Sequence, residues 1–110
     1  MQMRSWLTAL VLLASPGLAF AAGMVMGSDA DKALMDVNDK MTAAMKTEPT
    51  GDADKDFVAM MIPHHQGAVD MAEVELKYGK DPAILKLART IVSSQEKEIA
   101  QMKAWQTRHP

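Results

Sequence analysis

Two short interruptions divide residues 28–107 into three segments, and each segment has the hydrophobic period of an α-helix. The first interruption, residues 46–51, contains Pro49 and Gly51, and the second spans residues 79–81. Inside the segments apolar residues recur every three or four positions, with no alternating strand pattern. Connections this short make consecutive helices antiparallel neighbours. The sequence therefore predicts an all-α fold, a small antiparallel three-helix bundle, with residues 28–107 as its single domain.

The helix ends carry ordinary capping signals. Ser28 can cap the first helix, with Asp31 three residues later. Asp81 can cap the third helix, with Pro82 in its first turn. Gly79 is placed to end the second. The expected helices are residues 29–45, 52–78 and 82–106.

The first 21 residues have the pattern of a secretory signal peptide. Arg4 supplies a positive charge, residues 6–14 form a short apolar core, and Ala19-Phe20-Ala21 is an A-x-A cleavage box. Cleavage would leave a flexible leader, residues 22–27, and a periplasmic or secreted protein that is not held in a membrane. An uncleaved membrane anchor is the alternative, although the apolar run is short for a bilayer.

Several classes of function are disfavoured by composition. There is no cysteine, so neither a disulfide nor a thiolate ligand is available. Acidic residues outnumber basic ones by 14 to 12, and no basic patch indicates nucleic-acid binding. No nucleophile stands beside an orienting base, so we do not expect an enzyme. Methionine, by contrast, occurs 11 times in 110 residues and needs an explanation.

The middle helix carries two adjacent apolar seams, given its advance of about 100° per residue. The first, called here the Phe57 seam, consists of Phe57, Met60, His64, Ala68, Met71, Val74 and Tyr78. The second, the Val58 seam, consists of Val58, Met61, Ile62, His65, Val69, Ala72 and Leu76. We expect both seams to be buried, and both histidines with them. Pro63 should kink or break this helix, or else start a new one.

Each seam holds a methionine four residues before a histidine. Met60 precedes His64, and Met61 precedes His65. Side chains four apart share one helical face and can share one ion. His64 is the favoured ligand because Met71 continues its seam, whereas His65 is equally well interpreted as a surface residue.

Folding the flanking helices back should add methionines from both of them. In an antiparallel bundle Met41 and Met102 reach about the level of Met60, so their sulfurs should gather near His64. Thioether sulfur is a soft ligand that suits copper(I) and also silver(I). The alternative is that the methionines, Met41 and Met71 above all, only fill the core. The candidate metal ligands are Met41, Met60, Met61, His64, His65, Met71 and Met102.

Two polar residues interrupt the apolar stripe of the third helix. Gln95 and Glu98 could bond the free ring nitrogen of His64 or His65 and orient it. They could equally lie at the solvated edge of the stripe.

Residues 56–72, with the core His64-His65-x-x-Ala68-x-x-Met71, and the later pattern Gln95-x-x-Glu98-Ile99-x-x-Met102-x-x-Trp105 resemble domain of unknown function 305. The similarity spans about residues 28–107. It implies an exported, ferritin-like helical bundle of the kind that includes CopM-like copper-binding proteins. It also implies copper(I) or silver(I) binding for metal tolerance or trafficking, and supports Met60, Met61, His64, His65, Met71 and Met102 as ligands.

The sequence thus leaves two functions open. The leading hypothesis is a copper buffer or carrier, which could exchange metal with a copper transport or chaperone partner. The alternative is a structural or protein-interaction module without a metal, in which the wide apolar face of the middle helix packs against another chain or a second copy.

Overall fold

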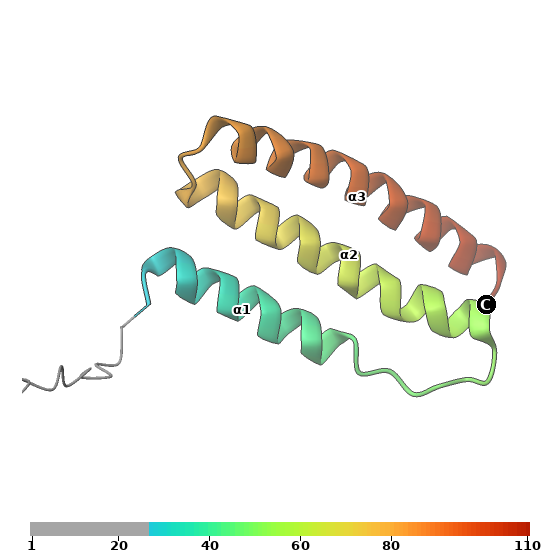
Figure 1. The fold of residues 1–110 in the computed structure, drawn as a ribbon. Helices are drawn as coiled ribbons and strands as arrows, with labels where there is room; N and C mark the ends of the chain where they lie inside the picture. The colour runs from blue at the N-terminus through green and yellow to red at the C-terminus, as the bar shows by residue number, and fades with distance from the viewer. Residues whose placement is uncertain (1–26) are drawn as a thin grey trace, which may run out of the picture.

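The computed structural model describes residues 27–110 and contains three helices: α1, Asp29–Ala44; α2, Ala53–Tyr78; and α3, Pro82–Arg108 (Figure 1). Consecutive helices run antiparallel, and within the described range no strand is present. The predicted all-α, three-helix fold is therefore confirmed, with α3 two residues longer than expected. The predicted signal peptide, residues 1–21, and nearly all of the predicted leader lie outside the described residues. No helix within residues 27–110 is long and apolar enough to cross a membrane.

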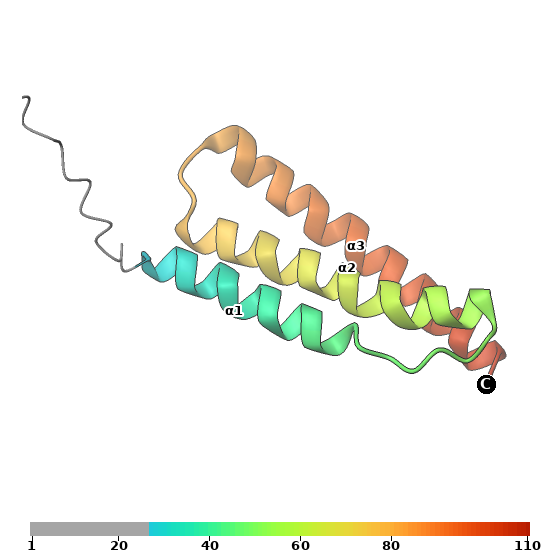
Figure 2. The same cartoon turned by 60° about the horizontal axis from the view of Figure 1, so that its bottom comes forward.

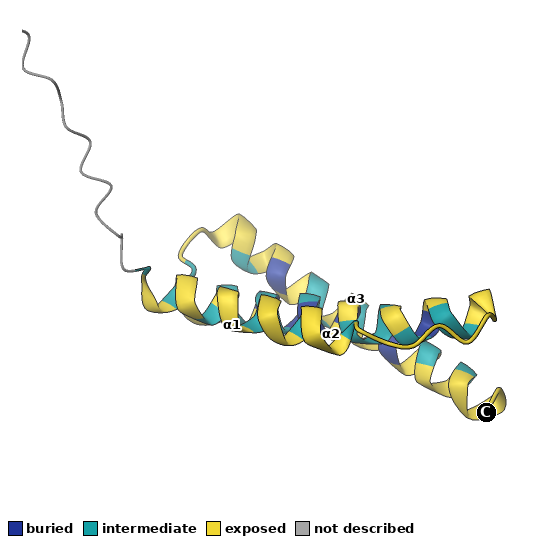
Figure 3. Ribbon diagram, turned by 90° about the horizontal axis from the view of Figure 1, so that it is seen from below, coloured by how far each residue is buried: buried dark blue, intermediate teal, exposed yellow. Residues whose placement is uncertain are grey.

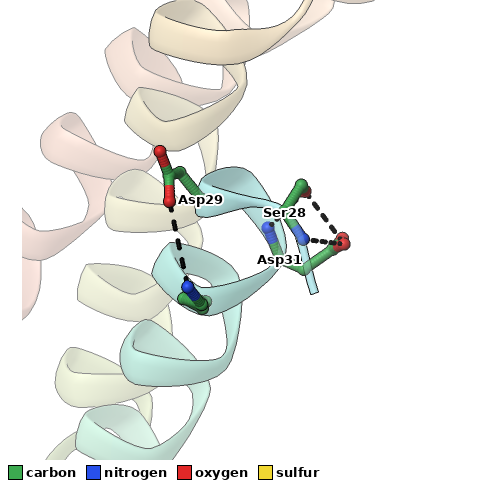
Figure 4. A network of polar contacts seen from close by, with 4 residues as sticks. Ser28, Asp29 and Asp31 are labelled. Carbon is green, nitrogen blue, oxygen red and sulfur yellow. Dashed lines mark hydrogen bonds and ion pairs between the residues drawn. The ribbon is translucent and has the colours of Figure 1, made fainter. Parts of the chain in front are cut away.

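Side-chain caps fix where the helices begin. At α1 the Ser28 hydroxyl accepts a hydrogen bond from the Asp31 backbone N–H, and the Asp31 carboxylate accepts one from the Ser28 N–H (Figure 4). Asp52 accepts from two backbone N–H groups at the start of α2, and Asp81 does the same for α3. These bonds satisfy N–H groups that the first turn of a helix leaves without partners.

The carboxylate of Asp56 orders the connection between α1 and α2. Asp56 accepts hydrogen bonds from the Thr50 backbone N–H, at 2.9 Å, and from the Thr50 hydroxyl, at 2.7 Å. These bonds to Thr50 hold the pKa of the Asp56 carboxyl below its ordinary value. Gly51 next to them has a φ of 86°, a conformation that favours glycine.

The three helices form a layer with α2 in the middle. α1 and α3 pack on α2, and no Cα atom of α1 lies within 8 Å of one in α3 (Figures 1 and 2). Met41 of α1 packs directly on Gly67 of α2, whereas α3 packs on the Val58 seam. Gly67 and His65 are two residues apart, about 200° around the helix, so α1 and α3 lie on nearly opposite faces of α2.

The core of this layer is thin. The buried apolar side chains are Val58, Val69 and Ala72 of α2 with Ala88 and Ile99 of α3, and among the described residues none of the large side chains is fully buried (Figure 3). Four of the seven Val58-seam residues are buried, which confirms the expectation for most of this seam; Met61 and Ile62 are half-buried, and Leu76 is exposed. The expectation that the Phe57 seam is also buried is wrong: Phe57 is 60% exposed, and Met60, His64 and Tyr78 are exposed too. The reason is that most of this seam lies between the faces of α2 that α1 and α3 cover, so Ala68, Met71 and Val74 are only half-buried.

α2 runs through Pro63 without interruption. A break at this residue, or a new helix beginning there, is therefore excluded. Because proline lacks an N–H group, the carbonyl of Ala59 loses its usual partner four residues on, and the helix tolerates this loss.

Candidate metal site

His65 is the one buried ionisable side chain among residues 27–110, with 9% of its surface exposed. It lies in the Val58 seam, where α2 meets α3. Its Nε2 atom is 2.5 Å from Oε2 of Glu98 on α3. Of the two possibilities left open for Glu98, the contact with a histidine is therefore present, and the histidine is His65. The expected burial of His65 is confirmed, and the alternative that it is a surface residue is excluded.

The other ring nitrogen of His65 has no partner. Nδ1 is buried, and no hydrogen-bonding group reaches it. A buried polar nitrogen without a partner costs free energy, of the order of 1–3 kcal/mol. Such an atom needs a physical reason to persist, and a bound ligand is one such reason.

The Glu98 contact determines what Nδ1 can do. A carboxylate accepts hydrogen bonds, so Nε2 of His65 carries the ring proton and donates a hydrogen bond to Glu98. In the neutral ring Nδ1 is then the atom with a free lone pair, which can accept a hydrogen bond or bind a metal. Metal-binding histidines commonly donate their other N–H to a carboxylate, which fixes the ring and raises its basicity. The buried nitrogen and its carboxylate partner therefore fit a metal ligand.

Two methionines lie one helical turn from this pair. Met61 precedes His65 by four residues on α2, and Met102 follows Glu98 by four residues on α3. Because α2 and α3 are antiparallel, these two steps lead to the same end of the helix pair. Met102 lines a hollow with Val58 and Trp105 at that end. Both methionines are half-buried.

The favoured ligand of the sequence analysis, His64, lies elsewhere. It is exposed on the Phe57 seam together with Met60, and Met71 is half-buried two turns further along. The rings of His64 and His65 are edge-on, with centroids 6.2 Å apart. His64 therefore shares its seam with two methionines but lacks the burial and the carboxylate partner that distinguish His65.

Met41 does not join the other methionines. Its sulfur lies against Gly67, between α1 and α2, while Met102 lies between α2 and α3. Since α1 and α3 are on nearly opposite faces of α2, the expectation that Met41 and Met102 gather around His64 is wrong. Residues 27–110 also contain no group of three or more His, Cys, Asp or Glu side chains placed to hold a metal.

The family model of a domain of unknown function, DUF305, matches residues 1–106 of the chain. The chain belongs to the DUF305 family. Among curated proteins, it is similar to the uncharacterized protein L153 of Acanthamoeba polyphaga mimivirus, with 43% identity over 49 residues. That alignment covers 44% of this chain and 32% of the viral protein, so the match spans about a third of the relative's length. The DUF305 assignment confirms the family resemblance read from the sequence.

Proposed function

We propose that this DUF305 protein binds a soft metal ion, copper(I) or silver(I), between α2 and α3. His65 supplies the nitrogen ligand through Nδ1, and Met61 and Met102 supply sulfur. The observation that carries the proposal is the buried Nδ1 atom without a partner on a ring whose Nε2 is bonded to Glu98. Thioethers beside a neutral imidazole favour a soft ion over magnesium or calcium, which prefer oxygen ligands.

The biological role that fits such a site is buffering or transfer of copper outside the cytoplasm. Thioether ligands are uncharged and cannot form disulfides, whereas thiolates are oxidised to disulfides in an oxidising compartment. The proposed export depends on residues 1–21. Mass measurement of the chain recovered from the bacterial periplasm tests it: a chain that begins at Ala22 supports export, and an intact chain retained in the cytoplasm contradicts it.

The binding proposal is tested by anaerobic titration with copper(I) against a competing chelator. The wild-type chain should take copper from a chelator of micromolar affinity. His65→Ala should lose most of that affinity, because it removes the only nitrogen ligand proposed. His109→Ala is the matched control, since His109 is exposed at the end of α3 and stacks on Trp105. Circular dichroism of each variant verifies that the helices persist. Equal affinity for His65→Ala and wild type would refute the site.

A further inference from the structure

The layer of three helices has one apolar side and one charged side. On the charged side, Asp36 and Lys40 of α1 line a shallow groove with Asp70, Glu73 and Lys77 of α2. Val74 and Tyr78, the last two residues of the Phe57 seam, also line this groove and so border α1. Leu34 is two residues from Asp36, about 200° around α1, and therefore lies toward the other side. Leu34 is exposed.

The apolar side continues from α1 across α2 to α3. On α2 it is the Phe57 seam from Phe57 to Met71, which lies between the faces that α1 and α3 cover. On α3, Trp105 lines a hollow with Phe57, so the Trp105 edge of α3 faces the same side. Leu87 precedes Trp105 by 18 residues, five turns of helix, and shares that edge. Leu87 is 53% exposed.

A single layer of helices cannot enclose a core, and stable domains bury such a face against a second layer. Here every helix contributes an exposed large apolar side chain to the same side. Soluble monomers rarely expose contiguous apolar patches larger than a few hundred Å². The apolar side of this layer therefore has the character of an interface.

The size of this face indicates what covers it. Helices of 26 and 27 residues are about 40 Å long, and packed helices lie about 9 Å apart. The flat area of the face is therefore on the order of 600 Å², and protruding side chains add to its accessible surface. A stable interface buries about 800 Å² on each partner. A single helix from another protein would fill one groove only, whereas a second layer of the same dimensions would cover all of it.

The charges on this face favour a copy of the same chain as that layer. A surface that packs on itself across a two-fold axis must avoid placing like charges together. The Phe57 seam contains no Asp, Glu, Lys or Arg, although 24% of the chain is charged. Glu98 is a charged residue on the Trp105 edge of α3, two turns before Trp105, and its carboxylate is paired with His65. We propose that two copies of this chain pack their apolar sides together to form a six-helix dimer. Met60 and Met71 then act as adaptable apolar contacts across the two-fold axis.

The test is the mass of the protein in solution, measured by light scattering and sedimentation. The protein is expressed from a gene that includes the signal peptide and the leader, residues 1–27. Copper(I) is both added and omitted, so that failure of the metal proposal does not obscure the result. Wild type should be a dimer in either case. Phe57→Glu and Leu87→Glu should each raise the dimer dissociation constant by about a hundredfold or more, since the symmetry buries each new charge twice.

Met35→Glu is the matched control. Met35 is 66% exposed. It is two residues, about 200° around α1, from the half-buried Val37, which borders α2, so it lies away from α2 and this variant should stay dimeric. Both interface positions are exposed in the single chain, and circular dichroism should show unchanged helix content. A wild-type monomer at all soluble concentrations overturns the proposal, and so does equal dissociation of the Met35→Glu and Phe57→Glu dimers. A chain that keeps residues 1–21 and is monomeric also overturns it, because the retained signal peptide would then be the occupant of the face.

Discussion

Oε2 of Glu98 lies 2.5 Å from Nε2 of His65, and this contact joins the middle of α3 to the middle of α2. One partner is buried and the other is half exposed, with 53% of the Glu98 side chain accessible. The contact therefore connects a buried ring to the solvated edge of the helix pair. It leaves Nδ1 as the only ring atom of His65 that is polar, buried and without a partner.

Replacing Glu98 by Gln should weaken copper(I) binding by about 10–100-fold, the usual effect of removing the carboxylate that orients a ligating histidine. The amide keeps the size of the side chain but no longer supplies a negative charge. Competition against a chelator measures the change. Glu96→Gln, at an exposed position of the same helix, should bind as wild type does. Unchanged affinity in Glu98→Gln would show that the carboxylate plays no part in binding.

Replacing Gly67 by Ala should destabilise the protein by about 1–3 kcal/mol, the cost of overpacking. A Cβ atom there would lie 2.7 Å from Cγ and 3.0 Å from Cβ of Met41, so α1 must move. At a solvent-exposed helix position the same change would stabilise the protein by about 1 kcal/mol. The sign of the change in unfolding free energy therefore shows whether Met41 packs closely on Gly67. Urea unfolding measures it. Adding Met41→Ala should recover part of the loss, and a stabilised Gly67→Ala variant would contradict the close packing of α1.

Acid should weaken the connection between α1 and α2 through Asp56. Bonds from Thr50 lower the pKa of this carboxyl in the folded state. A lowered pKa stabilises the folded state above the unfolded value, here 3.8, and this stabilisation is lost as the pH falls through the folded pKa. In Thr50→Ala the backbone N–H still donates, so the pKa of Asp56 should rise only part of the way to 3.8. Thr50→Ser should titrate as wild type does. NMR titration of the Asp56 carboxyl carbon provides the reading, and an unchanged pKa in Thr50→Ala would contradict the hydroxyl's contribution.

Replacing Ser28 by Ala should cost about 0.5–2 kcal/mol of stability. The substitution removes the hydroxyl that accepts from the Asp31 N–H at the start of α1. In Ser28→Ala, backbone hydrogen exchange should be fastest in the first turn of α1, because α1 packs less extensively on α2 than α3 does. Ser93→Ala, an exposed position within α3, should be neutral or slightly stabilising. Equal stability of Ser28→Ala and Ser93→Ala would show that the cap contributes nothing.

The helices could be predicted from sequence because their signals are local. Caps such as Ser28 and Asp81 stand within one turn of the bonds they form, and the loop at residues 46–51 is marked by its own proline and glycine. The arrangement of the helices is not local. The pattern of α2 showed that two seams are apolar but not which of them a neighbouring helix covers. Nothing in the sequence around Gly67 indicated that α1 packs there through Met41.

The site was predicted in part for the same reason. Glu98 stood out as a polar residue in an apolar stripe, and the structure confirms its contact with a histidine. The choice between His64 and His65 depended on which seam faces α3, which spacing within one helix cannot determine. The grouping of Met41 with Met102 failed because it assumed a closed bundle, whereas α1 and α3 lie on nearly opposite faces of α2.

The most direct test of the metal site is nitrogen NMR of the His65 ring during titration with silver(I), which is diamagnetic and stable in air. Nδ1 of His65 should shift strongly as one equivalent is added, while Nε2 keeps its proton and its bond to Glu98. A Nδ1 resonance that does not move, or a shift at His64 in its place, would contradict the account.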